Sequence, residues 1–225
     1  MDGHVFILPY NSAMRFNTLF FDLDETLYPT SSGLWTAIRE RINAYMHERL
    51  CFPPEQIEVL REQYFREYGT TLRGLQANYT VDMEDYLAFV HNVPLEAHLH
   101  PDPELRGVIE NLPARKFIFT NADSLHANRV LDVLGLQGCF DGILDVHTLA
   151  PYCKPMPESF ELALQAAGSP DRRTCALLDD QARITRAACQ LGFYSILVGK
   201  DSAGEDADAA LVKWTDLPGL LDGRI

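Results

Sequence analysis

The feature that most constrains the fold of this chain is a series of short apolar runs, each followed by a stretch of helical spacing. Five such runs lie at residues 19–21, 117–119, 143–144, 175–178 and 196–198. They are continuous rather than alternating, which indicates strands buried on both faces, as in a parallel sheet. Helical stretches between them end at Gly135, Gly168 and Gly192, and glycine commonly ends a helix. The alternation predicts an α/β protein with a Rossmann-like, doubly wound parallel sheet.

The segment 31–100 interrupts this alternation, because it holds helical patterns and no strand-like run. Three patterns are present, with apolar positions at Leu34, Ile38, Ile42, Tyr45 and Met46, then at Ile57, Leu60, Tyr64 and Tyr68, then at Tyr86, Leu87 and Val90. We therefore expect an all-helical subdomain inserted after the first strand. The α/β core then comprises residues 16–30 and 101–225, and the prolines around residue 102 suit the connection between the two units.

Composition indicates a folded chain in a reducing compartment. Of the 225 residues, 47% are hydrophobic and 23% are charged, as in an ordinary globular protein. The five cysteines show no C-x-x-C spacing, so we expect neither a disulfide framework nor a zinc site, and a cytoplasmic location. No apolar stretch is long enough to span a bilayer. Residues 1–15 lack a basic region before their short apolar run, which predicts a loosely ordered leader, with Met14 as an alternative start.

Two carboxylates follow the first apolar run directly. The i, i+2 spacing of Asp22 and Asp24 puts both side chains on one side of the strand end, while Leu23 points away. Ligands of open α/β sheets bind beyond the carboxyl ends of the strands, where this pair falls. Repulsion between the two acids favours a cation, and Mg²⁺ binds carboxylates together with phosphate oxygens. The alternative is a strand-end turn with solvated acids.

Polar groups suited to phosphate follow other strand ends. Thr120 and Asn121 offer a hydroxyl and an amide after the second run, and Lys154 offers a point charge on a loop. Asp179 and Asp180 form a second acidic pair after the fourth run. Each has an ordinary alternative, since such residues also cap helices or lie on the surface. Their shared position past the strands favours one site.

The charge balance of the chain limits its partners. The formal net charge of −13 argues against nucleic acid polymers and anionic membranes, which need clustered Lys and Arg. A phosphate substrate needs local positive charge, and a metal ion would supply it. The predicted partner is a small-molecule phosphomonoester, bound by a monomer or a small homo-oligomer.

In order along the chain, these motifs resemble those of the haloacid-dehalogenase-like (HAD) hydrolase superfamily. The four motifs are Asp-x-Asp-x-Thr-Leu-Tyr from Asp22, Phe-Thr-Asn, Lys-Pro and Asp-Asp. The likeness covers residues 16–200, and the helical insertion is similar to the cap domain of one branch. Within the superfamily, the chain resembles the pyrimidine 5′-nucleotidase group of yeast, plants and bacteria through Gly33-Leu34-Trp35, the stretch 68–75, Thr120-Asn121-Ala122-Asp123 and the stretch 126–131.

The resemblance implies a role for each motif residue. Asp22 would attack phosphorus to give an aspartyl-phosphate, and Asp24 would act as general acid and base while its backbone carbonyl binds metal. Thr120 and Lys154 would bind the phosphoryl group. The implied cofactor is Mg²⁺, and the predicted metal set is Asp22, Asp24, Asp179 and Asp180.

The predicted function is therefore a Mg²⁺-dependent phosphatase acting on a small phosphomonoester, most specifically a pyrimidine nucleoside 5′-monophosphate. Alternatives are a broad-specificity sugar-phosphate or pyridoxal-phosphate phosphatase, a phosphomutase, or a binding module without turnover. Asp24 argues against dehalogenation, because releasing a halide needs no acid. Gln181 and Ile184 replace the Ser and Asn usual in the nucleotidase group, which predicts a weakened metal site.

Other residues are weaker candidates. Arg129, with His126 one turn before it, would contact the phosphate or the substrate, or else pair on the surface. Cys153 is either buried or activated by its lysine neighbour. Two further groups have a functional and a structural interpretation: a metal or hinge role for His98, His100 and Asp102, and base stacking or core packing for Tyr28, Trp35, Tyr68 and Tyr79.

Overall fold

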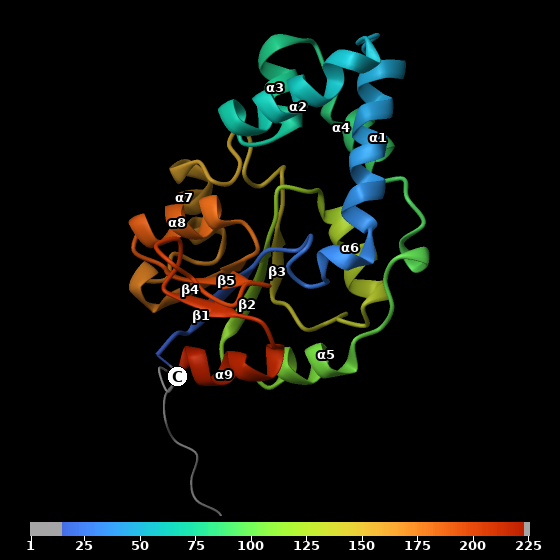
Figure 1. Cartoon of the computed structure of the whole chain (residues 1–225). Helices are drawn as coiled ribbons and strands as arrows, with labels where there is room; N and C mark the ends of the chain where they lie inside the picture. The colour runs from blue at the N-terminus through green and yellow to red at the C-terminus, as the bar shows by residue number, and fades with distance from the viewer. Residues whose placement is uncertain (1–14, 223–225) are drawn as a thin grey trace, which may run out of the picture.

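The computed structural model describes residues 15–222, so the predicted leader lies outside the described residues except for Arg15. Its centre is a six-stranded sheet in the order β3-β2-β1-β4-β5-β6, in which all neighbouring strands are parallel. A lobe of helices rises from one end of this sheet (Figure 1). The doubly wound α/β fold expected from the apolar runs is confirmed. Among residues 15–222, no helix is both long and apolar enough to cross a membrane.

The strands follow the apolar runs closely. Their bounds are β1 Thr18–Phe21, β2 Arg115–Phe119, β3 Gly142–Leu144, β4 Cys175–Asp179, β5 Tyr194–Val198 and β6 Ala209–Leu211. After β1 the chain adds β2 and β3 on one side, then crosses to place β4 on the other side of β1. The strand order therefore reverses between β1 and β4, and open α/β sheets bind ligands at such a switch point.

The two faces of the sheet are covered by different helices, since side chains alternate along each strand. Phe20 and its neighbours on one face pack against α7 (Pro157–Ala166) and α8 (Ala182–Gln190). Phe21 and its neighbours on the other face join a larger cluster with three further helices. These are α5 (Pro103–Glu110), α6 (Ser124–Val133) and α9 (Leu217–Leu221). Both faces are covered, which is why the runs are continuous.

Between β1 and α5 the chain forms helices only, here called the cap. They are α1 (Leu34–Glu48), α2 (Pro54–Tyr68), α3 (Thr71–Asn78) and α4 (Met83–Val90), and α1 runs from the sheet up into the lobe (Figure 1). Three of them match the predicted patterns, whereas α3 was not predicted from periodicity. Its Gly74 packs where an added Cβ would lie 2.3 Å from Tyr64, so the packing needs a residue that weakens the helical pattern. The bounds 31 and 100 of the inserted unit stay a prediction.

The remaining elements are short. Among residues 15–222, four 3₁₀ turns occur at Thr30–Ser32, Leu95–Ala97, Arg172–Thr174 and Trp214–Asp216. The edge strand β6 and the helix α9 were also not predicted, because three and five residues carry little periodicity. Helix α5 was not predicted either, and it buries only two apolar residues, Leu105 and Ile109.

Candidate active site

The side chains at the ends of β1 and β4 meet around a buried lysine. The Nζ of Lys154 donates to Oδ1 of Asp22 and to Oδ2 of Asp179, at 2.7 Å each. The Lys154 side chain is only 1% exposed. The two strands are tied at this point by the bond from Asp22 N to Leu178 O, 2.9 Å long. Three predicted site residues from distant parts of the chain therefore lie within one hydrogen-bonded cluster.

The charged groups in this cluster shift one another's pKa values. Burial raises the pKa of Asp22 well above its ordinary value, although the Lys154 charge opposes the shift. Burial also opposes the lysine charge, but Asp179 and Asp22 outweigh it and raise the pKa of Lys154. Lys154 is therefore an ammonium. Burial, and then the charge of Asp179, raise the pKa of Asp180 to about 7, so the cluster holds more acid than one ammonium neutralises.

Three carboxylates in the cluster fit a divalent cation. Asp22, Asp179 and Asp180 each offer one oxygen, and these atoms lie within 4.8 Å of one another. The Thr26 hydroxyl donates to Asp22 Oδ2 at 3.2 Å or to Asp180 Oδ1 at 3.3 Å, and accepts from Asp180 N at 3.1 Å. Carboxylate oxygens are the ligands that Mg²⁺ prefers, so the donor set suits that ion. The carboxylate of Asp24 lies outside this group, and its backbone carbonyl stays a predicted ligand.

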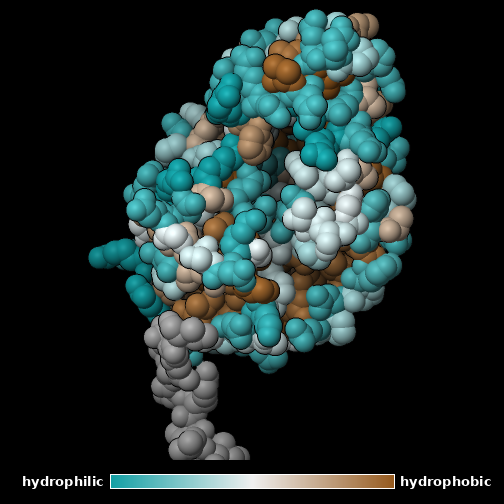
Figure 2. Space-filling model, in the orientation of Figure 1, coloured by the Kyte–Doolittle hydropathy of each residue, from teal (hydrophilic) through white to brown (hydrophobic). Residues whose placement is uncertain are grey.

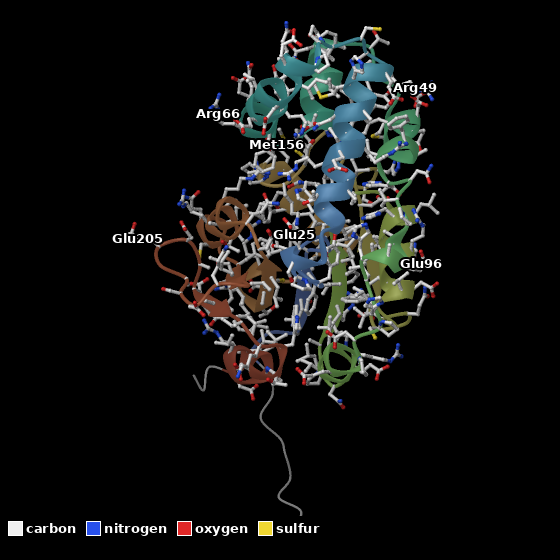
Figure 3. The ribbon with its side chains drawn as sticks, turned by 45° about the vertical axis from the view of Figure 1, so that its right-hand side comes forward. Glu25, Arg49, Arg66, Glu96, Met156 and Glu205 are labelled. Carbon is white, nitrogen blue, oxygen red and sulfur yellow. The ribbon has the colours of Figure 1, made fainter. Side chains whose placement is uncertain are left out.

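Asp24 is bound by a tyrosine and a histidine rather than by Lys154. The Tyr28 hydroxyl, at 2.7 Å, and His126 Nε2, at 3.0 Å, both bind its Oδ1. Burial opposes its ionisation, but His126 and Tyr28 outweigh burial and lower the pKa of Asp24. The next residue, Glu25, has φ 59°, a left-handed conformation that turns the chain sharply. In Figure 3 Glu25 lies between the sheet and the cap.

His126 is supported by a second histidine from the cap. Its ring stacks on the ring of His91, with centroids 4.1 Å apart, and His91 Nδ1 lies 2.5 Å from Asp123 Oδ2. Asp123 also caps α6 by accepting from His126 N at 2.8 Å. Within residues 15–222, Nδ1 of His126 is buried and has no hydrogen-bond partner. Sequence reasoning singled out His126 but missed His91, because no local motif signals this pairing.

The predicted phosphate-binding residues take two different positions. Thr120 is 1% exposed, and its hydroxyl oxygen accepts from Ala122 N at 3.0 Å. Asn121 binds the backbone of Lys154, accepting from its N at 2.8 Å and donating to its O at 3.1 Å. Asn121 therefore positions the loop that carries the lysine.

Arg129 does not join this cluster. Its guanidinium donates to the carbonyl oxygens of His91 and Val93, at 2.9 Å each, and so holds the chain that returns from the cap. His98, considered above as a metal ligand, lies 3.1 Å from Ser32 O through Nδ1, and Asp102 caps α5. Arg129 and His98 thus hold segments that join the cap to the core, and Asp102 begins the core helix that follows the cap.

A cavity of about 320 Å³ lies between the strand ends and the cap. Asp22, Asp24, Thr120 and Lys154 line its core side, with Gln181 and Ile184 beside them. Helices α1, α2, α3 and α4 contribute the other side, with residues that include Trp35, Arg39, Arg61, Phe65, Leu72 and Tyr86. The surface is hollowed where the two parts of the molecule meet (Figure 2). Tyr28, Tyr68 and Tyr79 do not line the cavity, so of the four aromatic candidates only Trp35 faces it.

The core holds the cap at the end of α2. Arg183 donates to Phe65 O at 3.0 Å and to Gly69 O at 2.9 Å, and its guanidinium lies 3.5 Å from the Phe65 ring centroid. At Gly69 φ is 84°, and an added Cβ would lie 2.7 Å from Cys153 Sγ. Burial raises the pKa of Cys153, which therefore acts in packing. Gln181 accepts from Arg183 Nε at 3.0 Å, which gives this unusual motif residue a structural contact.

The fold and the site together define an α/β protein with an acidic, lysine-bearing pocket beneath a helical cap. The chain belongs to the haloacid dehalogenase-like hydrolase family, whose model matches residues 16–192. The superfamily inferred from the four motifs is thereby confirmed, whereas the narrower nucleotidase group stays a prediction.

Comparison with individual proteins agrees with this assignment. The chain is 31% identical over 192 residues to Phosphate metabolism protein 8 of Saccharomyces cerevisiae; the match covers 79% of this chain and 60% of that protein. The HAD-hydrolase YfnB of Bacillus subtilis, solved with bound magnesium, has a TM-score of 0.63 at 18% identity and covers 92% of this chain and 99% of its own. The HAD phosphatase of Thermococcus onnurineus has a TM-score of 0.63 at 14% identity, and the match covers 93% of this chain and 100% of that protein's chain. These two likenesses concern the fold.

Proposed function

We propose that this protein is a Mg²⁺-dependent phosphatase that hydrolyses a small phosphomonoester, a pyrimidine nucleoside 5′-monophosphate, through an aspartyl-phosphate on Asp22. The observation that carries the proposal is the buried ammonium of Lys154, held at 2.7 Å from both Asp22 and Asp179 beside the cavity. It is a fixed positive charge next to a carboxylate nucleophile, in a chain whose net charge is −13. Such a charge stabilises the transferring phosphoryl group.

Asp22 provides the nucleophile. One of its oxygens attacks phosphorus while the bond from phosphorus to the leaving oxygen breaks, and water then cleaves the acyl phosphate. Lys154 binds Oδ1 and the Thr26 hydroxyl reaches Oδ2, so the carboxylate is held in one orientation. The Thr120 hydroxyl, whose oxygen already accepts from Ala122 N, has its hydrogen free for a phosphoryl oxygen.

Asp24 moves the proton. It protonates the leaving oxygen in the first step and takes a proton from the attacking water in the second. Its lowered pKa favours the second role. The negative charge of a bound phosphate would raise that pKa, so the acid form is favoured in the complex with substrate. Because Tyr28 and His126 both bind Oδ1, the proton is transferred at Oδ2.

The acidic group would hold the metal. Asp22, Asp179 and Asp180 supply its carboxylate oxygens. A bound Mg²⁺ would offset negative charge on the phosphoryl oxygens.

The substrate class is supported by the cavity and by the relatives. A volume of about 320 Å³ suits a small molecule. The words "phosphate metabolism" and "phosphatase" in the names of two similar proteins agree with the reaction. Motif likeness to the nucleotidase group supports the nucleotide.

The test is phosphate release from UMP, CMP, ribose 5-phosphate and pyridoxal 5′-phosphate by wild type and Asp22→Asn, with Mg²⁺ and after chelation. We expect UMP or CMP to be hydrolysed best, and Asp22→Asn to lower kcat by at least ~1,000-fold, because the amide is a poor nucleophile. Chelation should stop the reaction, and added Mg²⁺ should restore it.

Asp132→Asn is the matched control, since Asp132 is exposed near the C-terminus of α6 and does not line the cavity. It should behave as wild type. Substantial turnover by Asp22→Asn, or undiminished rates in metal-free buffer, would contradict the mechanism, and a preference for pyridoxal 5′-phosphate would contradict the nucleotide.

A further inference from the structure

The cap side of the cavity carries an excess of hydrogen-bond donors. Arg39, Arg61, Tyr86 and Trp35 line it from three different helices. Arginine and the indole N–H only donate, and a tyrosine hydroxyl donates readily. Glu62 is the one carboxylate that the cap contributes to the described lining. The cap side of the cavity therefore offers a ligand mainly hydrogen-bond donors, so it suits a ligand that carries acceptors.

Most of these donors are unused by the protein itself. Within the part of the chain that the structure describes, the Arg39 guanidinium, the Tyr86 hydroxyl and the Trp35 indole N–H have no hydrogen-bonded partner. Arg61 has one, because its NH1 donates to Asn43 Oδ1 at 3.0 Å, which fixes the side chain and leaves other N–H groups free. Arg39 is exposed to solvent, whereas Tyr86 is buried and Arg61 is partly buried. Donors without a protein partner that line a cavity favour a ligand that brings oxygen atoms.

These donors also lie near enough to one another for Arg39 and Tyr86 to affect the pKa of Arg61. Burial, followed by the charge of Arg39, lowers the pKa of Arg61, and Tyr86 lies near enough to oppose that shift. Burial raises the pKa of Tyr86, so its hydroxyl keeps its proton. Within residues 15–222 no carboxylate forms an ion pair with either guanidinium, although Glu25 lies near enough to Arg39, and Glu62 near enough to Arg61, to interact through charge. Two such guanidinium groups still gain from a partner that accepts hydrogen bonds.

Flat side chains border the same space. Trp35 lies one turn before Arg39 on α1, and Phe65 lies one turn after Arg61 on α2, so each ring accompanies one arginine on the face of its helix. Phe65 is 41% exposed, unusual for a large apolar residue, and its ring is backed by Arg183. Aromatic rings and arginines together suit a planar ligand with polar atoms at its edge.

We infer that Arg39, Arg61 and Tyr86 form the specificity end of the cavity, and that they bind the carbonyl oxygens of a flat ring in the leaving group, as in a uracil base. This inference rests on the proposed phosphatase function and deepens it. The phosphoryl group then lies at Asp22 and Lys154, and the ring lies among the cap helices.

The experiment compares substrates with and without the ring. We would measure kcat/KM for UMP and for ribose 5-phosphate with wild type, Arg61→Met and Tyr86→Phe. The ratio of UMP to ribose 5-phosphate should fall at least ~10-fold in each variant, because only UMP loses a hydrogen bond. The effect should appear mainly in KM. An unchanged ratio in both variants would overturn the inference.

A second arm tests the chemistry of the acceptor. In 2-thio-UMP and 4-thio-UMP one carbonyl oxygen of the base is replaced by sulfur, a much weaker acceptor. Wild type should use at least one of them several-fold less well than UMP, and Arg61→Met should reduce that difference. Equal use of all three nucleotides by wild type would also overturn the inference.

The control is Arg66→Met on the same helix. Arg66 is exposed, does not line the cavity and projects outward from the cap (Figure 3). It should leave the substrate ratio unchanged. Failure of the wild type to release phosphate from any substrate would count against the proposed function, whereas normal ribose 5-phosphate turnover with an unaltered ratio would count against the specificity end alone. Ribose 5-phosphate turnover also verifies that each variant folds.

Discussion

Asp24 accepts two hydrogen bonds on the same carboxylate oxygen, one from Tyr28 and one from His126. The arrangement fixes the plane of the carboxylate and leaves its other oxygen for the proposed proton transfer. His126 does not line the cavity between the strand ends and the cap, so it contacts the site through Asp24. Its own orientation depends on the stacked ring of His91.

Replacing His126 should separate turnover from binding. His126→Gln lacks the ring that reaches Asp24, so we expect kcat to fall ~10-fold, the effect of about one hydrogen bond, while KM changes little. The pH profile of kcat should also shift, because His126 lowers the pKa of Asp24. Steady-state kinetics between pH 5.5 and 8.5 measure both quantities.

Leu125→Ala is the neighbouring control, since Leu125 is 71% exposed on the same turn of α6. It should keep the wild-type profile. A His126→Gln enzyme with raised KM and normal kcat would show that His126 affects substrate binding instead.

The sequence predicts a site residue when the pattern that marks it lies next to it in the chain. Asp22 and Asp180 follow apolar runs, and strand ends at a switch point must meet, so their proximity could be predicted. Asn121, expected at the phosphate, lines the cavity and also binds the Lys154 backbone, because an amide can satisfy a backbone N–H and C=O together. His91 carries no local signal, since its partners Asp123 and His126 lie more than 30 residues away.

At the scale of elements, the side chain of Arg183 connects α8 to the end of α2. Arg183 at the start of α8 binds two carbonyl oxygens at the end of α2, where backbone acceptors are otherwise unpaired. The contact crosses from the core to the cap beside the cavity. The sequence could not reveal it, because a helix C-terminus accepts from any donor that the fold brings near.

Removing this contact should loosen the cap. Arg183→Met keeps the length of the side chain and loses both bonds, so we expect KM to rise ~10-fold. Arg186→Met on the same helix, which loses only an exposed pair with Asp206, should leave KM unchanged. Steady-state kinetics with the best substrate measure the difference, and equal KM values for the two variants would contradict the role of Arg183.

Helix prediction in the cap succeeded where apolar residues fill the inward positions. The positions Leu34, Ile38, Ile42, Tyr45 and Met46 are all buried on α1, which has 15 residues. By contrast, α3 has eight residues and buries Arg73 and Gly74 along with its apolar side chains. The Arg73 guanidinium donates to Val146 O and Tyr152 O of the core, so a polar residue occupies an inward position. Periodicity alone cannot recover such a helix.

For the whole molecule, one buried histidine links stability to pH. Burial, and then the charge of His126, lower the pKa of His91 below its ordinary value, although Asp123 opposes the shift. A histidine whose pKa is lower in the folded state binds fewer protons there than in the unfolded chain. It therefore reduces stability as the pH falls below ~6.5, the pKa of an unperturbed histidine.

His91→Gln should remove that dependence. Urea midpoints at pH 7.5 and pH 5.5 should show the variant less stable than wild type at pH 7.5, with a smaller gap at pH 5.5. The carboxylates of the metal cluster titrate in both proteins and cancel in the comparison. A gap that stays constant or widens on acidification would contradict the assigned direction.

The two chain crossings between the lobes both pass Asp24. The outgoing crossing begins with the turn at Glu25, directly after Asp24. The returning crossing begins at His91, which stacks on the histidine that Asp24 binds. The orientation of the Asp24 carboxylate is thus tied to the position of the upper lobe through both crossings. Under the proposed mechanism, a shift of the lobe that loosens the enclosure of the substrate would therefore also disturb the carboxylate that handles the proton.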